Sequence, residues 1–216
     1  MLIQPNHKLL FIGDSITDCD RERPIAEGNG LGNGYVSLVN AWLSSTYPQH
    51  KIRVFNLGSS GNTVRELDER WQTDVLGLNP DWLSIMIGIN DVWRQFDSPL
   101  QIEMHVSLDE YQLTLEKLIQ KTKPQLKGLI LMTPYFIDLN KDDLMRIMMD
   151  QYSAVVRQLA EKHQAVFVDT QSVFDTYLKT EHPMSLAWDR IHPNQTGHMI
   201  IARAFLDAIG YVWHQK

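Results

Sequence analysis

The stretch KLLFIGDS, residues 8–15, runs from apolar residues directly into a glycine, an acid and a serine. Leu9 to Ile12 are consecutive apolar residues, which is typical of a strand buried on both faces. Gly13, Asp14 and Ser15 follow where such a strand would end. Two interpretations are open at this point: a turn followed by a helix cap, or a group of residues that performs chemistry.

Further apolar runs of the same kind recur along the chain. They are rich in Ile, Val, Leu and Phe and do not alternate cleanly with polar residues, which indicates a parallel sheet covered on both faces. The predicted strands are Lys8–Ile12, Ile52–Asn56, Trp82–Gly88, Gly128–Met132 and Ala165–Asp169.

The longer stretches between these runs have the three- and four-residue spacing of helices. Helices are predicted over Tyr35–Tyr47, Thr63–Leu78, Leu108–Lys123, Leu144–His163 and Gln195–Ile209, with loops over Cys19–Gly34 and Arg94–Leu108. Strands that alternate with helices predict an α/β fold, a three-layer αβα sandwich of flavodoxin-like type around a five-stranded parallel sheet. No linker or shift in composition divides the chain, so residues 1–216 are expected to form one domain.

Composition excludes several classes of partner and compartment. A formal net charge of −6 argues against nucleic acid or an anionic membrane as the main partner. Cys19 is the only cysteine, which excludes an internal disulfide framework and a cysteine-rich zinc site. The N-terminal apolar run is too short for a signal peptide, and no run approaches the roughly 18 apolar residues of a membrane span. We therefore expect a soluble, cytoplasmic protein.

A second informative segment is AWDRIHPNQTGH, residues 187–198. Asp189 and His192 are three positions apart, so one turn places both side chains on the same side. The carboxylate can then accept from the imidazole Nδ1 and leave Nε2 free to take a proton. Ser15 supplies a hydroxyl that such a base would activate. Each residue also has an ordinary alternative: a helix-start acid, a surface histidine and a helix cap.

The ends of two other predicted strands offer hydrogen-bond donors. Gly61, in SSGNT, could present a backbone N–H without a side chain to obstruct a substrate, and Asn90, in GIND, could present its amide. Together with the N–H of Ser15 they could hold a developing oxyanion. Singly, Gly61 is explained as a turn residue and Asn90 as a helix cap. All of these residues follow strands whose carboxyl ends share one edge, which favours the chemical interpretation.

Four short blocks, GDSIT, GSSGNT, GIND and DRIHP, resemble the sequence blocks of the SGNH hydrolases, also called the GDSL esterase/lipase family. They occur in the family's order, from residue 13 to residue 193. The resemblance implies the three-layer fold, with Ser15 as nucleophile, Asp189 and His192 as acid and base, and Gly61 and Asn90 as oxyanion partners of the Ser15 N–H. It implies no metal and no organic cofactor.

Longer strings, such as IMIGINDVWRQ and AWDRIHP, are most similar to bacterial acetyl-xylan esterases of the SGNH type. This similarity implies removal of acetyl groups from short xylo-oligosaccharides, and Trp93 and Trp188 are candidates for contacts to the sugar or the acyl group. Both tryptophans could equally be core aromatics. Another acyl class, such as a lysophospholipid or thioester, and a non-catalytic carbohydrate-binding relative are the alternatives.

Other polar residues are expected to have structural roles. His198, in a predicted helix, is expected to pack rather than react, and Asp18 and Asp20 are expected to pair with nearby arginines rather than a metal. Tyr211 and Trp213 near the C-terminus could pack on their own chain or on a neighbouring subunit, so a homo-oligomer stays open.

Overall fold

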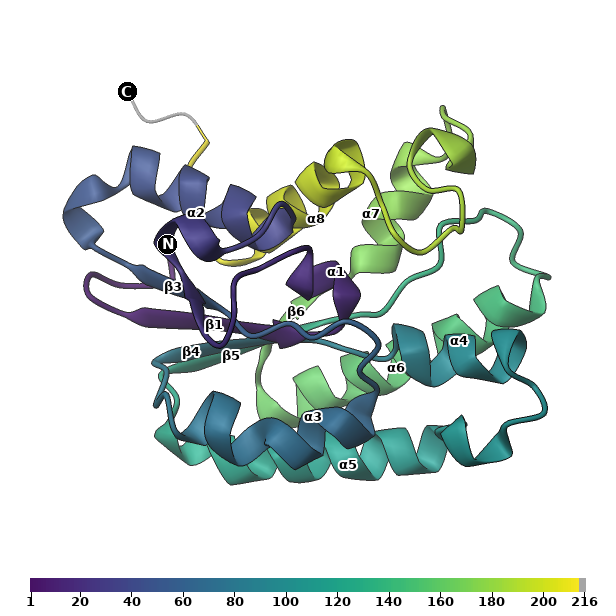
Figure 1. Ribbon diagram of the computed structural model, residues 1–216. Coiled ribbons are helices and arrows are strands. Elements are labelled where there is room, and N and C mark those ends of the chain that lie inside the picture. The colour runs from purple at the N-terminus through teal and green to yellow at the C-terminus, as the bar shows by residue number, and fades with distance from the viewer. Residues whose placement is uncertain (214–216) are drawn as a thin grey trace.

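Six strands form one sheet in the order β2-β3-β1-β4-β5-β6. The computed structural model describes residues 1–213 (Figure 1). All neighbouring strands are parallel except β2, which runs antiparallel to β3. The strands are β1 (Lys8–Gly13), β2 (Ala26–Glu27), β3 (Arg53–Asn56), β4 (Trp82–Met86), β5 (Gly128–Met132) and β6 (Val166–Val168).

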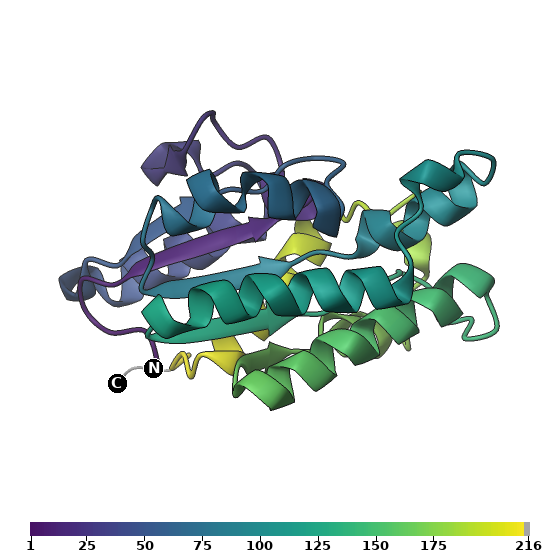
Figure 2. The ribbon, with the colours of Figure 1, turned by 90° about the horizontal axis from the view of Figure 1, so that it is seen from below.

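Helices cover both faces of this sheet. In Figure 1, α2, α7 and α8 lie above the strands and α3, α5 and α6 lie below them, and Figure 2 shows the second group in front of the sheet. The helices are α1 (Ser15–Asp18), α2 (Tyr35–Thr46), α3 (Val64–Trp71), α4 (Ile89–Asp97), α5 (Leu108–Thr122), α6 (Leu144–His163), α7 (Thr170–Tyr177) and α8 (Gln195–Ala208). The predicted three-layer αβα sandwich is therefore confirmed.

Strand β1 shows why its sequence is apolar without alternation. It pairs with β3 on one side and β4 on the other, and residues 9–12 are completely buried. The ring of Phe11 packs on Tyr35 of α2 and Phe205 of α8, with ring centroids 5.6 and 4.8 Å away. Successive side chains of a strand point to opposite faces, so a strand with helices above and below must be apolar on both.

The sheet has six strands, and the prediction of five was wrong in this respect. The additional strand β2 lies within the predicted loop Cys19–Gly34 and pairs Ala26 with Asn56 and Glu27 with Phe55. An ion pair between Arg53 and Glu27 reinforces this edge. A strand of two residues has no periodicity, so only its tertiary pairing reveals it.

The predicted helices are present, and three further α-helices, α1, α4 and α7, were not predicted. The bounds of α6 agree with the prediction, and the helix predicted over Thr63–Leu78 is α3 continued by a π-helical turn at Gln72–Leu76. Helix α4 extends into the predicted loop Arg94–Leu108. It was not predicted because the apolar run of β4 continues into Ile89, so the start of the helix has no distinct pattern. Helix α7 follows β6 directly and was also missed.

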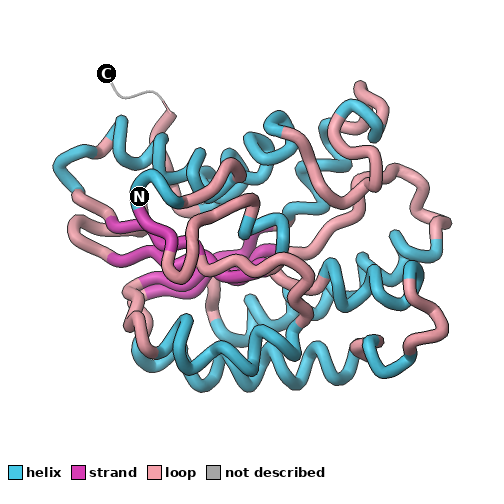
Figure 3. Tube along the Cα trace, in the orientation of Figure 1, coloured by secondary structure: helices cyan, strands magenta, loops and turns pink. Residues whose placement is uncertain are grey.

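The carboxyl ends of the parallel strands meet at one edge of the sheet, where the loops of Figure 3 gather beside α1. Strands β1, β3 and β4 lead there into the segments that bear Ser15, Gly61 and Asn90, and Asp189 and His192 lie in the loop that precedes α8. At the C-terminus, Tyr211 is buried against Tyr47 and Trp42 of the same chain. None of the helices within residues 1–213 is long and apolar enough to cross a membrane.

Candidate active site

Ser15 stands at the junction between β1 and α1. Asp14 precedes it as the helix cap, and its Oδ1 accepts a hydrogen bond from the N–H of Ile16 at 3.0 Å. Gly13 is required by close packing, since a Cβ at this position would lie 2.2 Å from the carbonyl oxygen of Met86. The turn that presents Ser15 is thus held by its own cap and by the neighbouring strand.

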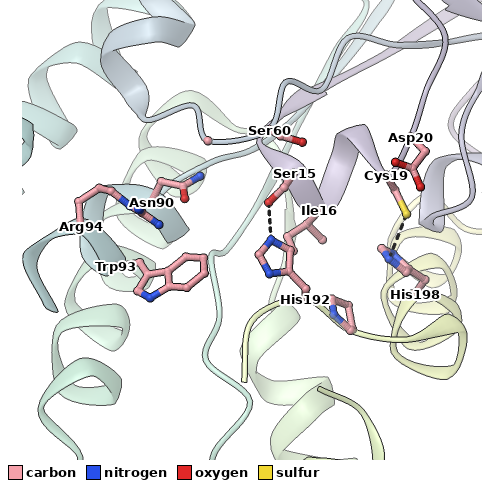
Figure 4. A pocket seen from close by; sticks show the side chains of 12 residues that line it. Ser15, Ile16, Cys19, Asp20, Ser60, Asn90, Trp93, Arg94, His192 and His198 are labelled. Atoms are coloured by element: carbon pink, nitrogen blue, oxygen red, sulfur yellow. Dashed lines mark hydrogen bonds between the residues drawn. The ribbon is translucent and has the colours of Figure 1, made fainter. Parts of the chain in front are cut away.

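Ser15, His192 and Asp189 form a continuous hydrogen-bonded chain, of which Figure 4 shows the bond between Ser15 and His192. The Ser15 Oγ lies 2.8 Å from the His192 Nε2, and the His192 Nδ1 lies 2.6 Å from the Asp189 Oδ2. A carboxylate at Nδ1 places the imidazole proton there and leaves Nε2 as the acceptor for the serine hydroxyl. The structure therefore brings together the residues that the sequence predicted as nucleophile, base and acid.

Asp189 is itself held by the backbone of the same loop. Its Oδ1 accepts from the N–H groups of Ile191 and His192 at 2.9 and 2.8 Å. Partial burial acts to raise the pKa of Asp189, but the hydrogen bonds from the His192 ring and from these two N–H groups outweigh it and lower the pKa below its usual value. The carboxyl group therefore stays ionised at neutral pH and can stabilise an imidazolium.

The three residues predicted as oxyanion donors, Ser15, Gly61 and Asn90, line one cavity. The N–H of Ser15 is at the first position of α1 and has no acceptor within its own helix. Gly61 adopts a positive φ of 82°, a conformation that favours glycine, and its N–H makes no hydrogen bond within residues 1–213. The Asn90 amide donates one hydrogen to the carbonyl of Asn62 at 3.0 Å, and its second hydrogen has no acceptor among residues 1–213.

A cavity of about 410 Å³ opens beside these groups. Trp93 lines it, and the centroid of its ring lies 5.6 Å from that of His192. Trp188 does not line this cavity: its side chain is 83% exposed and borders a neighbouring hollow with Met184 and Arg190. The cavity is lined by Ser15, Ile16, Cys19, Asp20, Ser60, Gly61, Asn90, Trp93, Arg94, His192, Pro193 and His198.

Cys19 and His198 form one wall of the cavity. The sequence did not predict that these two residues lie there. Burial lowers the pKa of His198 to about 4, so this imidazole is neutral at physiological pH. Its Nδ1 accepts from the N–H of Tyr35, so its proton is on Nε2, 3.5 Å from the Cys19 Sγ. The expectation that His198 packs rather than reacts agrees with these contacts, but no sequence signal places it beside the cavity.

Two carboxyl groups, Asp14 and Asp91, are completely buried beneath the site. Burial raises the pKa of each to about 7. Each offers one oxygen to a backbone N–H, Asp14 to Ile16 and Asp91 to Val64, while the other oxygen has no partner among the described residues. Asp91 thereby joins the start of α4, which bears Asn90, to the start of α3.

No metal-ligand set is formed by the described part of the chain. Among residues 1–213, no group of three or more His, Cys, Asp and Glu side chains is arranged to hold a metal ion. Asp18 instead accepts from Arg23 and from Ser60, as expected of a structural carboxylate.

Comparisons with known proteins find similarity to this chain over nearly its whole length. The model of the GDSL-like lipase/acylhydrolase family matches residues 11–200. An acetylxylan esterase from Geobacillus stearothermophilus is 58% identical over 215 residues, which is 99% of this chain and 98% of the relative. A solved structure of an acetylxylan esterase from that organism matches with a TM-score of 0.99 and 57% identity over 100% of both chains. An alpha/beta hydrolase enzyme from the metagenome of Lake Arreo, Spain, matches with a TM-score of 0.95 and 52% identity over 97% of this chain and 98% of its own. The chain belongs to the GDSL-like lipase/acylhydrolase family.

Proposed function

We propose that this protein is a serine esterase that removes acetyl groups from short acetylated xylo-oligosaccharides through an acetyl-enzyme intermediate. The main observation in support of this reaction is the chain of hydrogen bonds from the Ser15 Oγ through His192 to Asp189. The choice of substrate is supported by the 58% identity to an acetylxylan esterase over 99% of the chain.

Acylation begins when the His192 Nε2 takes the Ser15 proton and the Oγ attacks the acetyl carbonyl carbon. The carbonyl electron pair moves to the oxygen, which the N–H groups of Ser15 and Gly61 and the amide of Asn90 stabilise. The bond to the sugar oxygen then breaks, and His192 gives its proton to that leaving oxygen.

Deacylation repeats these steps with water as the nucleophile. His192 takes a proton from the water, which attacks the acetyl-serine carbonyl, and it returns the proton to the Ser15 Oγ as acetate leaves. Asp189 stays ionised throughout, holds the ring tautomer and stabilises the imidazolium.

The dimensions and walls of the cavity favour a small acyl group on a polar leaving group. Its volume of about 410 Å³ is at the lower end of ligand sites, roughly 300–1,000 Å³. Trp93 offers an aromatic surface on one side, and Asp20 and Arg94 offer polar groups at the rim. Long acyl chains would need an extended apolar groove.

The direct test measures acetate released from acetylated xylobiose, with 4-nitrophenyl acetate and octanoate for comparison. We expect hydrolysis of acetylated xylobiose and at least tenfold higher kcat/KM for the acetate ester than for the octanoate ester. A preference for the octanoate ester would instead indicate a lipid or thioester class. Exposure to a fluorophosphonate should modify Ser15, whereas an unmodified protein would indicate a non-catalytic binding module.

A further inference from the structure

Arg70 of α3 has a side chain that is 18% exposed and reaches the end of β1, the end of β3 and the loop between β3 and α3. Its Nη2 donates to the carbonyl of Gly13 at 3.0 Å and its Nη1 to the carbonyl of Leu57 at 2.6 Å. Its Nε donates to the Asn62 Oδ1 at 2.6 Å, and Asp74 balances its charge. The planar guanidinium thus binds two backbone carbonyls and one side-chain amide oxygen in one geometry.

Two residues that Arg70 contacts, Gly13 and Asn62, adjoin groups of the active site. The Gly13 carbonyl is two residues before Ser15, at the end of β1. Asn62 directly follows Gly61, and its own carbonyl accepts the hydrogen bond that orients the amide of Asn90. A displacement of Asn62 would therefore move two of the three proposed oxyanion donors relative to Ser15.

The same loop has a second, independent attachment. The Asp18 Oδ2 accepts from both the N–H and the hydroxyl of Ser60 at 3.0 Å. Removal of the Arg70 side chain leaves this attachment in place, so the loop is expected to stay folded while the segment at Gly61 and Asn62 shifts. Donors that stabilise a transition state act through their position, and a displacement of about 1 Å can cost roughly 100-fold in rate.

We propose that Arg70 is a positioning residue that sets the geometry of the oxyanion donors at Gly61 and Asn90 relative to Ser15. The proposal rests on the proposed esterase function. It concerns catalysis after the substrate is bound, because Arg70 does not line the cavity. Its loss should therefore lower kcat and leave KM almost unchanged.

Arg65 of the same helix provides a matched control. Like Arg70, it binds two backbone carbonyls and one carboxylate, here those of Glu103, His105 and Glu110. None of these groups adjoins the active site. Arg65→Met therefore reports what the loss of a comparable set of hydrogen bonds does to the fold alone.

The experiment measures kcat and KM for 4-nitrophenyl acetate, and Tm, for the wild type, Arg70→Met, Arg70→Lys and Arg65→Met. We expect Arg70→Met to lower kcat about 10- to 100-fold with KM within threefold. Arg70→Lys should recover part of this loss, and Arg65→Met should keep kcat within twofold. If Arg70→Met is active within twofold, or if Arg65→Met loses as much kcat, the positioning role is wrong. If Arg70→Met does not fold, wild-type kcat in Arg70→Lys would overturn the proposal, whereas a lowered kcat at unchanged KM and Tm would support it.

A double variant tests whether Arg70 acts through the oxyanion donors. Combining Arg70→Met with Asn90→Ala should cost less than the product of the two single losses, because the amide that Arg70 helps to place is already absent. If the two losses in kcat multiply fully, Arg70 acts on catalysis through groups other than the Asn90 amide. A wild type that hydrolyses no ester would instead refute the proposed function and say nothing about Arg70.

Discussion

At Ser15, the hydroxyl is held 2.8 Å from the Nε2 of the His192 ring. The reactivity proposed for it comes from its surroundings: Asp189 fixes the tautomer of His192, and Asp14 fixes the turn. Each of these residues has an ordinary structural explanation on its own. The hydrogen bond between Ser15 and His192 does not follow from these separate roles, since a helix cap at Ser15 would not need a histidine 177 residues away.

Replacing the proposed nucleophile gives the most direct prediction at this scale. Ser15→Ala should lower kcat for 4-nitrophenyl acetate by roughly 10⁶, as for the removal of a triad nucleophile. Because Asp14 still caps α1, the Tm should stay close to that of the wild type. Steady-state kinetics and thermal unfolding measure both, and near wild-type hydrolysis by Ser15→Ala would refute the mechanism.

The side-chain donor of the oxyanion site gives a smaller effect. Asn90→Ala should lower kcat by roughly 10²–10³ with little change in KM, because its amide contributes more to the transition state than to the bound ester. Single-turnover kinetics would separate acylation from release of product. A variant with a raised KM and unchanged kcat would indicate that Asn90 binds substrate rather than the oxyanion.

At the scale of elements, the starts of α1, α3 and α4 are connected to one another beneath the site. Asp91 accepts from the first N–H of α3, and Arg70 of α3 holds the end of β1. The connection has a cost, because burial raises the pKa of Asp91 to about 7 and disfavours its charged form. A buried carboxyl group in this state makes the stability of the protein depend on pH.

Asp91→Asn should remove that part of the pH dependence. In the unfolded chain the carboxyl loses its proton near its ordinary value of 3.8, and in the folded chain only near pH 7. The folded state therefore binds more protons between these values, and its stability falls as pH rises, by at most about 1.4 kcal/mol per pH unit. Asparagine keeps the oxygen that accepts from Val64 and cannot become charged.

Urea unfolding at pH 4.5, 6 and 8 tests this prediction. The free energy of unfolding of Asp91→Asn, relative to the wild type, should increase from pH 4.5 to about pH 7 and then level off. Asp142→Asn, at an exposed carboxylate, serves as the control and should follow the wild type at every pH. A constant difference between Asp91→Asn and wild type would contradict the raised pKa.

The sequence predicted helices and strands best where their apolar pattern extends over many residues. Helix α6 spans 20 residues with a regular apolar face, and its predicted bounds agree with the structure. Strand β2 has two residues and α7 has eight, so neither produces a clear period. Helix α4 was hidden because its first apolar residue continues the run of β4. Short or adjoining elements are decided by what they pack against.

At the scale of the whole molecule, the parallel sheet collects residues from positions 15 to 192 at one edge. The helices on both faces bury the strands and leave their carboxyl ends accessible, which is where open α/β sheets bind ligands. The cavity is therefore a consequence of the fold, and its chemistry comes from the loops.

The mechanism that we propose needs no metal ion. Incubation with EDTA followed by desalting should leave kcat for 4-nitrophenyl acetate and Tm unchanged within error. A loss of activity that Zn²⁺, Mg²⁺ or Ca²⁺ restores would contradict the prediction and require a metal-assisted step.

From the sequence alone, the order of apolar runs determined the three-layer class, and four short blocks determined the residues Ser15, Gly61, Asn90, Asp189 and His192 as candidates. These features are local in the chain: a run of apolar residues or a block of neighbours carries its own signal. The tertiary structure decided the rest, namely the sixth strand, the exposure of Trp188, the wall formed by Cys19 and His198, and the contacts of Arg70. Each of these depends on which distant segments meet in space, and that is set by packing rather than by the spacing of residues along the chain.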